Sequence, residues 1–552
     1  MLALLSLLVT FQGILSDPLL VDTARGRIRG LRADDGDYSM FLGIPYGKVD
    51  PENPFGAAEP YPRFAEVFEA NNDSAICPQR EELSNEIMGT LDCLNLNIFV
   101  PNITTSTSKI PVLVWIHGGG FTNGNGGKAL HGPKYLVRHD IIVVSINYRL
   151  GPYGFMCLDI PEVSGNQGFK DQTIALRWIR DNIEAFGGDV NKITVYGESA
   201  GAASVEFHLV SENEKLFHQV ILSSGAIFGR WAIGEVDNTA PSRLAARLGL
   251  QTDNVQEALS YLKDMDVKKV IEANTGGFRG CVEKRFDSVE GFLHEHPFTI
   301  KTIPKAANMS IITGYNDQES LMLYVNTPPE MFQNIDPFRS FAEQFPEDQF
   351  DEIYNFVRRF YIGDAEINED VRWDLIDFNS DNSFNHPSHR SLNRFLKSGV
   401  ERVYHYIFSY TGGRNMVKAR SNITVGGAAH ADELGYVFDM HPLANIGDEA
   451  DYITVDRMTT LWANFVKYGN PTPEVTQLLP VVWPVATNQR LNYLDIGSNL
   501  VLGTRPFHDR MTFWDLFVEA FPFVTPNNAG FVNRSNSTFL FIVMYSVWKW
   551  IS

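Results

Sequence analysis

Continuous apolar runs mark the part of the chain between residues 110 and 225. The segments PVLVWI (111–116) and IIVVSINY (141–148) are mostly apolar and are bounded by Gly- and Asn-rich stretches. Runs of this kind suit strands that are buried on both faces, as in a parallel sheet. Shorter runs, ITVY (193–196) and QVILSS (219–224), predict two further strands.

A helical pattern separates the second and third of these predicted strands. Ala175, Ile179, Ile183 and Phe186 recur at helical spacing, and Gly187-Gly188 terminates the pattern. Small residues directly after ITVY permit a second helix to begin there. The alternation of strands and helices predicts an open α/β sheet.

The pattern is less regular beyond residue 230. Helical stretches are predicted near 348–361 and 454–467, and a strand is predicted at 403–410. Between residues 20 and 520 there is no internal repeat and no low-complexity linker. These elements fit either a cap region or insertions into the α/β domain.

The first apolar run follows the initiator methionine. Residues 2–15 have the length of a signal-peptide core, and Ser16-Asp17-Pro18 follows them. A buried N-terminal strand is the alternative, but the run lacks the alternation of a strand. We therefore expect a signal peptide over 1–16 and a secreted protein.

A second apolar run, residues 539–551, closes the chain and is interrupted by Lys549. Upstream lie the small residues Asn528-Ala529-Gly530 and a mostly polar spacer. This arrangement is typical of a glycolipid-anchor signal, and a docked terminal strand is the alternative. The main domain is expected over 17–526 and a C-terminal tail with a hydrophobic segment over 527–552, with a membrane anchor and a docked strand as the two alternatives for the tail.

Composition narrows the class of protein. The chain has 552 residues, of which 44% are hydrophobic and 20% charged, so disordered, collagen-like and coiled-coil proteins are excluded. With 46 Lys and Arg against 66 Asp and Glu, the net charge of −20 repels phosphate backbones, and no nucleic-acid partner is expected. Four cysteines are too few for a disulfide scaffold or a zinc-finger array.

Candidate chemistry begins where the predicted strand ITVY ends. It runs directly into Gly197-Glu198-Ser199-Ala200-Gly201, a G-x-S-x-G motif between a strand and a helix. In this context the motif is typical of a nucleophile elbow, in which a strained turn presents the serine. An ordinary Gly-rich turn is the alternative.

The segment HGGGF (117–121) follows the strand PVLVWI. Consecutive glycines let backbone N–H groups approach a developing oxyanion without interference from a Cβ atom. A flexible loop or a phosphate cradle is the alternative, but the Lys-Ser/Thr of a phosphate-binding loop is missing. A glycine loop upstream of an elbow serine indicates a hydrolase.

With these motifs the chain resembles the type-B carboxylesterases, the cholinesterase-like family of α/β hydrolases, and insect carboxylesterases in particular. The resemblance implies an α/β-hydrolase fold with a large, mostly parallel central sheet, flanking helices and insertions that form a gorge or cap. The segments that carry it are FLGIPYG (41–47), LDCLNLNIFVP (91–101), VWIHGGGF (114–121), INYRLGPYGF (146–155), GNQGFKDQTIALRWIRDNIEAFGGD (165–189), GESAG (197–201), GAAHADELGYVF (427–438) and LWANFVKYGNP (461–471).

The resemblance also implies the remaining site residues. It selects His430 as the base and Glu319 as the acid, with Asp317 as the nearby alternative acid. The oxyanion is expected to be bound by the N–H groups of Gly119, Gly120 and Ala200. The implied reaction is ester hydrolysis through an acyl-enzyme, without a metal or cofactor, and its activity should fall below about pH 6.5.

The resemblance has further implications for the cysteines and for one ion pair, and secretion has one for the sequons. By resemblance Cys77 and Cys93 form a disulfide, and Arg149 and Asp171 form a buried ion pair, whereas Cys157 and Cys281 are expected to be buried free thiols. Secretion would make the Asn-x-Ser/Thr sequons glycosylation candidates, foremost those at Asn72, Asn102, Asn308 and Asn422.

The expected substrate is an ester of a small apolar molecule, such as a xenobiotic, an odorant or a lipid-like ester. No Trp lies between the first two cysteines, which argues against a choline ester. Glu198 stands where juvenile hormone esterases typically carry Gln, so that activity is an alternative; Phe228 and Trp231 are expected to line the acyl pocket. A non-catalytic adhesion protein is the remaining alternative.

Overall fold

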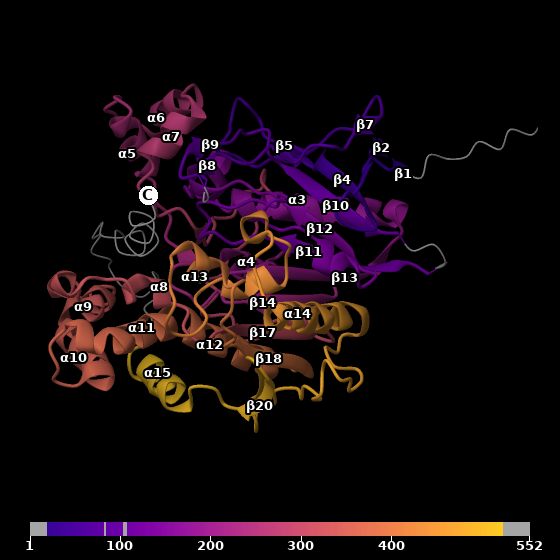
Figure 1. Ribbon diagram of the computed structural model, residues 1–552. Coiled ribbons are helices and arrows are strands. Elements are labelled where there is room, and N and C mark those ends of the chain that lie inside the picture. Colours follow the sequence, from indigo (N-terminus) through magenta and orange to yellow (C-terminus); the bar gives the residue numbers. More distant parts are fainter. Residues whose placement is uncertain (1–18, 82–83, 103–107, 523–552) are drawn as a thin grey trace, which may run out of the picture.

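The computed structural model describes residues 19–81, 84–102 and 108–522 (Figure 1). The predicted signal peptide and C-terminal tail lie outside these residues. The centre of the molecule is an eleven-stranded sheet. From one edge to the other its strands are β3 (Leu31–Arg32), β4 (Tyr38–Pro45), β10 (Asn95–Pro101), β12 (Ile142–Ile146), β11 (Ile110–Ile116), β13 (Gly188–Glu198), β14 (Gln219–Ser223), β17 (Ser310–Asn316), β18 (Arg402–Phe408), β19 (Asn492–Ile496) and β20 (Leu500–Thr504).

The sheet is parallel at its centre and antiparallel at both edges. Strands β12, β11, β13, β14, β17, β18 and β19 pair in parallel, and the remaining pairs are antiparallel. In the register, Val114 of β11 lies opposite Val144 of β12 and Val195 of β13. The predicted mostly parallel α/β sheet is confirmed, and each strand predicted from an apolar run is present.

Helices cover both faces of the sheet. Val112, Val114 and Ile116 pack in one core with α3 (Gln167–Asn182), α4 (Ala200–Val210) and α12 (His386–Lys397). The alternate residues Leu113 and Trp115 pack in a second core with α1 (Lys134–Val137) and α14 (Glu449–Tyr468). Because successive strand residues point to opposite faces, a wholly apolar run is what burial on both sides requires.

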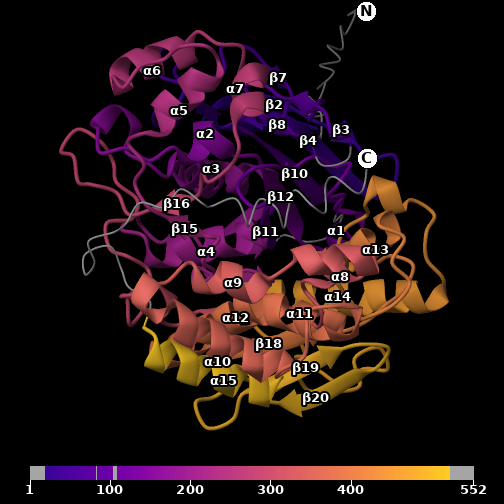
Figure 2. The same cartoon turned by 90° about the vertical axis from the view of Figure 1, so that its left-hand side faces the viewer.

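Two further groups of helices gather at one end of the sheet (Figures 1 and 2). Each has its own small apolar core. One group contains α5 (Ala240–Arg247), α6 (Val255–Lys263) and α7 (Val267–Ala273), and the other contains α8 (Leu321–Tyr324), α9 (Pro337–Ala342), α10 (Phe350–Ile362), α11 (Arg372–Ser380) and α15 (His508–Ala520). The predicted helical stretches near 348–361 and 454–467 correspond to α10 and α14.

The remaining elements are short. A π-helical turn, Asp381–Asn385, joins α11 to α12. A three-stranded sheet and three two-stranded sheets lie outside the central one. These small elements are β1 (Leu20–Thr23), β2 (Gly26–Arg29), β5 (Gly47–Lys48), β6 (Glu59–Pro60), β7 (Phe68–Glu69), β8 (Gln79–Arg80), β9 (Ile87–Met88), α2 (Gly151–Phe155), β15 (Ile233–Gly234), β16 (Gly280–Cys281) and α13 (Met416–Arg420).

The helix predicted before the third strand ends earlier than its pattern. α3 stops at Asn182, and a 3₁₀ turn covers Ile183–Phe186. Gly187 adopts a left-handed conformation with φ of 84°, and Gly188 already begins β13. The apolar spacing continued through the 3₁₀ turn, so periodicity alone could not separate the two kinds of helix.

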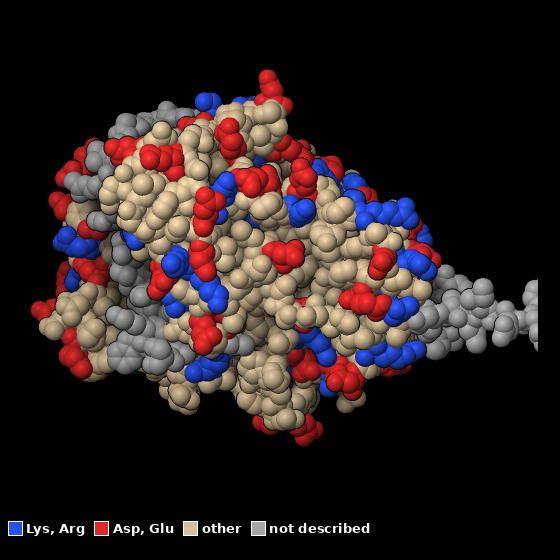
Figure 3. Space-filling view, turned by 90° about the horizontal axis from the view of Figure 1, so that it is seen from above, with Lys and Arg blue, Asp and Glu red and all other residues tan. Residues whose placement is uncertain are grey.

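One face of the molecule carries mixed charge. On the face seen in Figure 3, basic side chains alternate with acidic ones and form no continuous basic patch. In the part of the chain that the structure describes, no helix has both the length and the apolar character needed to cross a membrane.

The structure contains two disulfides, and one of them corrects an expectation. Cys77 is joined to Cys93, the pair that the resemblance implies. Cys157 and Cys281, expected to be free thiols, are joined to each other. Gly165 makes room for this bridge, because a Cβ there would lie 2.5 Å from the Cys281 sulfur and 2.6 Å from the Cys157 sulfur. The partners are 124 residues apart, so only the tertiary fold reveals the pair.

We expect denatured but unreduced protein to contain no reactive thiol, because all four cysteines are paired. A thiol-reactive dye in guanidinium should detect none before reduction and four after it. As a control, Cys157→Ser should release one thiol, that of Cys281. Detection of two thiols in the unreduced wild type would disprove the second bridge, whose loop constraint amounts to roughly 5 kcal/mol in the chain-entropy estimate.

Candidate active site

Ser199 occupies a sharp turn between β13 and α4. Its φ of 54° and ψ of −122° are unusual for a residue with a side chain, and its N–H donates to the Ser223 carbonyl at 2.8 Å. A Cβ at Gly197 would lie 2.3 Å from the Gly201 backbone, and one at Gly201 would lie 2.0 Å from the Ile116 carbonyl oxygen. Both glycines are therefore sterically required, and the strained turn expected of a nucleophile elbow is present.

The glycine loop after β11 lies against this turn. A Cβ at Gly118 would approach the Ser199 Cβ to 3.0 Å, and one at Gly119 would lie 2.1 Å from the Asn123 carbonyl oxygen. Gly119 and Gly120 have positive φ angles of 99° and 59°. Only glycine adopts such a backbone easily in so little space.

Three backbone N–H groups lie in the glycine loop and at the start of α4. Among the described residues, no acceptor is paired with the N–H of Gly119, Gly120 or Ala200. Ala200 is also the first residue of α4, where unpaired N–H groups and the helix dipole favour negative charge. The geometry suits the binding of an oxyanion next to Ser199.

His117, at the head of the glycine loop, has a supporting position. Its ring stacks on Tyr148 at a centroid distance of 4.4 Å, and its Nδ1 lies 2.8 Å from the Gly118 carbonyl oxygen. Burial lowers the pKa of His117 to about 4, so the imidazole is neutral at physiological pH. The side chain fixes the loop rather than supplying charge.

His430 and Glu319 meet although 111 residues separate them. His430 Nδ1 lies 2.6 Å from Glu319 Oε2, and the His430 N–H donates to the Glu319 carbonyl at 3.1 Å. The other carboxylate oxygen, Oε1, accepts from the Asn316 N–H at 2.7 Å. These contacts fix both the ring and its carboxylate at the carboxyl end of β17.

Asp317, the alternative acid, is engaged elsewhere. Its Oδ1 accepts from the Ala428 N–H at 2.6 Å, so it braces the loop that carries His430 without contacting the imidazole. Burial raises the pKa of Asp317 to about 6. The geometry thus favours Glu319 over Asp317 as the partner of the ring.

Two further carboxylates surround the imidazole. Glu198 Oε1 lies 3.2 Å from His430 Nε2, and buried Glu433 is held by Asn316 Nδ2 at 2.7 Å. Burial alone would lower the pKa of His430, but the charges of Glu198, Glu319 and Glu433 outweigh it and raise the pKa to about 9. Burial and the charge of Glu319 raise the pKa of Glu433 to about 7.

Sequence reasoning did not find Glu433. The only signal was its place three residues after His430 in the segment HADE, and an acidic residue on a loop is usually solvated. Its importance depends on complete burial beside Glu319, which the fold alone determines.

The two residues expected in the acyl pocket are placed differently. Trp231 packs near Phe121, which directly follows the glycine loop, with ring centroids 6.3 Å apart. Phe228 instead lies beneath the guanidinium groups of Arg390 and Arg394, at 4.0 and 4.3 Å. The structure therefore brings Trp231 to the site, while Phe228 contacts Arg390, Arg394 and the Phe298 ring.

The ion pair implied by the resemblance is present beneath the site. Arg149 Nη2 lies 2.7 Å from Asp171 Oδ1, and both side chains are fully buried. The guanidinium also donates to the carbonyls of Pro54 and Gly56, at 3.1 and 2.7 Å. With its donors satisfied in this way, the buried charge braces the N-terminal segment against α3.

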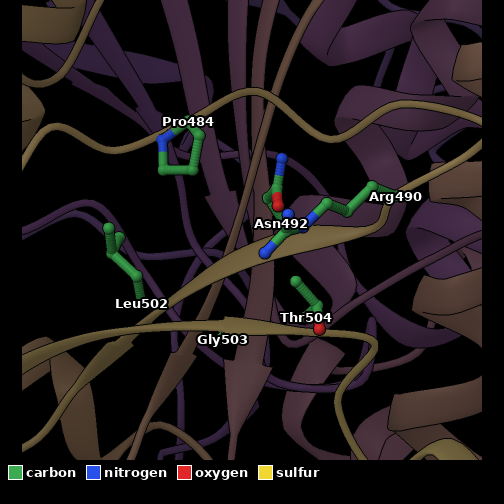
Figure 4. Close-up of a pocket in the computed structure, with 6 residues that line it drawn as sticks. All are labelled: Pro484, Arg490, Asn492, Leu502, Gly503 and Thr504. Carbon is green, nitrogen blue, oxygen red and sulfur yellow. The ribbon is translucent and has the colours of Figure 1, made fainter.

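A pocket of about 390 Å³ lies elsewhere, at the edge of the sheet (Figure 4). Four strands separate β20, which contributes to it, from β13, a span of roughly 24 Å at the usual strand spacing. None of the predicted site residues lines it. Its lining consists of Pro484, Arg490, Asn492, Leu502, Gly503 and Thr504.

No metal centre accompanies the site in the part of the chain described: the residues there contain no group of three or more His, Cys, Asp or Glu side chains placed to hold an ion. The described residues include a strained serine, a carboxylate-paired imidazole and backbone N–H donors that have no acceptor among them. These are the elements of acyl transfer by nucleophilic catalysis.

The known proteins that this chain is similar to are esterases. The model of the carboxylesterase family matches residues 17–514. Juvenile hormone esterase of Heliothis virescens is 29% identical over 90% of this chain and 94% of its own. Esterase E4 of Myzus persicae is 31% identical over 80% and 84%, and juvenile hormone esterase of Tribolium castaneum is 30% identical over 79% and 80%.

Proposed function

The chain belongs to the carboxylesterase family and is a carboxylic ester hydrolase, and we propose that it hydrolyses esters of small apolar molecules through an acyl-enzyme on Ser199. The observation that carries the proposal is the 2.6 Å contact between His430 Nδ1 and Glu319, with His430 Nε2 3.2 Å from Glu198, the residue before the elbow serine. A paired imidazole beside an activated serine is the arrangement that acyl transfer needs.

The first half of the reaction forms the acyl-enzyme. His430 accepts the hydroxyl proton through Nε2 while Ser199 Oγ bonds to the acyl carbon. The carbonyl oxygen becomes an oxyanion and receives hydrogen bonds from the N–H groups of Gly119, Gly120 and Ala200. As the intermediate collapses, His430 returns the proton to the ester oxygen, and the alcohol leaves.

The second half repeats these steps with water. A water molecule gives a proton to His430 and attacks the acyl carbon, and the oxyanion again accepts hydrogen bonds from the same N–H groups. Collapse breaks the bond to Ser199 Oγ, which regains its proton, and the carboxylic acid departs. Throughout, Glu319 orients the imidazole and stabilises its cation without itself taking the proton.

The proposed substrates are apolar xenobiotic, odorant or lipid-like esters. The Trp231 side chain, which packs on Phe121 beside the glycine loop, supports an apolar acyl group. A juvenile-hormone-type ester is the second candidate, because two of the similar proteins are named juvenile hormone esterases. Glu198, where such enzymes typically carry Gln, weighs against it.

We propose that the main domain extends over 17–526 and that the protein is secreted. The two disulfides support an oxidising compartment. Of the glycosylation candidates, Asn72, Asn308 and Asn422 are exposed, whereas the Asn102 side chain donates to Asp37 at 2.7 Å. Membrane tethering by the tail remains a prediction.

We expect Ser199→Ala to reduce turnover of p-nitrophenyl butyrate by at least about 10³-fold, because the nucleophile is removed. Ser204→Ala is the matched control. It removes a buried hydroxyl one turn along the same helix, which donates to the Ala200 carbonyl and has no role in the proposed reaction. An organophosphate should label the wild type once per chain and leave Ser199→Ala unlabelled. Full activity in Ser199→Ala would refute the mechanism, whereas an inactive wild type would favour the adhesion alternative.

The raised pKa of His430 predicts the pH dependence. Only the neutral ring accepts the serine proton, so kcat/KM should rise with pH and inflect above 6.5. Glu198→Gln removes one of the charges that raise the pKa, and the inflection should move to lower pH. The measurement is kcat/KM from pH 5 to 10, with Glu212→Gln, an exposed carboxylate paired with Arg285, as control. Equal inflections in Glu198→Gln and the wild type would contradict this electrostatic account.

A further inference from the structure

A single π-helical turn interrupts the long helix that α11 and α12 would otherwise form. It covers Asp381–Asn385 and continues directly into helical residues on both sides. Such turns are rare, since their hydrogen bonds are less favourable, and they often occur at functional sites.

The turn is held firmly by its first residue. Buried Asp381 accepts from the Tyr361 hydroxyl at 2.8 Å and from Asn385 Nδ2 at 2.9 Å. It also lies 3.1 Å from Arg510 Nε in α15. The surrounding helices therefore fix the turn, and the residues between its ends have defined positions.

Two of those residues reach the candidate active site. The Phe384 ring lies 4.3 Å from the His430 ring between centroids, with the planes inclined by 33°. The Ser383 carbonyl accepts from Trp231 Nε1 at 2.9 Å, and Phe384 lies 6.1 Å from the Trp231 ring. Phe121, Trp231 and Phe384 are thus successive neighbours between the glycine loop and the imidazole.

Phe384 differs from an ordinary core residue. It is only partly buried, whereas Phe378, in the same stretch of helix, is 1% exposed and packs against Phe338 at 4.7 Å. The His430 side chain is itself 15% exposed. A partly open aromatic ring beside a partly open imidazole leaves apolar surface available to a ligand.

We propose that Phe384 is a specificity-determining residue that borders the acyl chain of the substrate and supports the His430 ring. The inference rests on the proposed function. The leaving oxygen must reach His430 Nε2 at the edge of the ring, whereas Phe384 and Trp231 lie along the face of the ring and beside the glycine loop. The acyl chain is the part of the ester that can occupy that side.

The test compares acyl chains at constant leaving group. Replacing Phe384 by Ala or Leu opens space, so kcat/KM for a branched or long p-nitrophenyl ester should rise about tenfold relative to the acetate. Phe384→Trp narrows the space and should shift the same ratio in the opposite direction. Phe378→Leu is the matched control and should leave the ratio unchanged.

Further measurements keep the result interpretable. A ratio between two substrates does not depend on how much enzyme is folded, and organophosphate titration counts the competent sites in each variant. A series of acetate esters with different alcohols should change by less than about threefold. An unchanged acyl ratio in the Ala, Leu and Trp variants, or a shift confined to the alcohol series, would overturn the proposal. Full turnover of the same esters by Ser199→Ala would instead overturn the proposed function itself.

Discussion

Crowding around the turn at Ser199 is the constraint on which the rest of the site depends. β13 ends and α4 begins within one residue. There is no room for a Cβ at Gly197 against the Gly201 backbone, at Gly201 against the Ile116 carbonyl of β11, or at Gly225 against the Ser199 carbonyl. The serine is thereby held at the carboxyl end of a buried parallel strand. The first turn of α4 and the glycine loop lie beside it, so the same close packing positions the proposed nucleophile and the proposed N–H donors.

The second shared element is the charge around His430. One imidazole lies among Glu198, Glu319 and Glu433, all largely removed from water. In the proposed mechanism this field stabilises the imidazolium cation that forms during acyl transfer, and it also reduces the fraction of neutral base at a given pH. Asn316 donates its backbone N–H to Glu319 and its side-chain Nδ2 to Glu433, so it holds the two carboxylates at separate positions.

The sequence was informative where chemistry and periodicity coincide. Apolar runs predicted the central strands because these are buried on both faces, and the motifs around Ser199 and Gly119 predicted a hydrolase. His430 and Glu319 came only from resemblance, since no local pattern distinguishes them from other acids and histidines. The Cys157–Cys281 bridge, buried Glu433 and the reach of Phe384 through a π-helical turn depend on contacts between distant segments, which single-sequence patterns do not contain.

The Cys157–Cys281 bridge also affects how the protein responds to cleavage by a protease. Residues 157–281 form a covalent loop that includes Ser199, the β13–α4 turn and the peripheral helices α5, α6 and α7 (Figure 2). A protease that cuts once between α5 and α7 would leave both fragments joined through sulfur, with the strands of the central sheet still packed on their helices. Nicked enzyme would then separate into two chains only on a reducing gel.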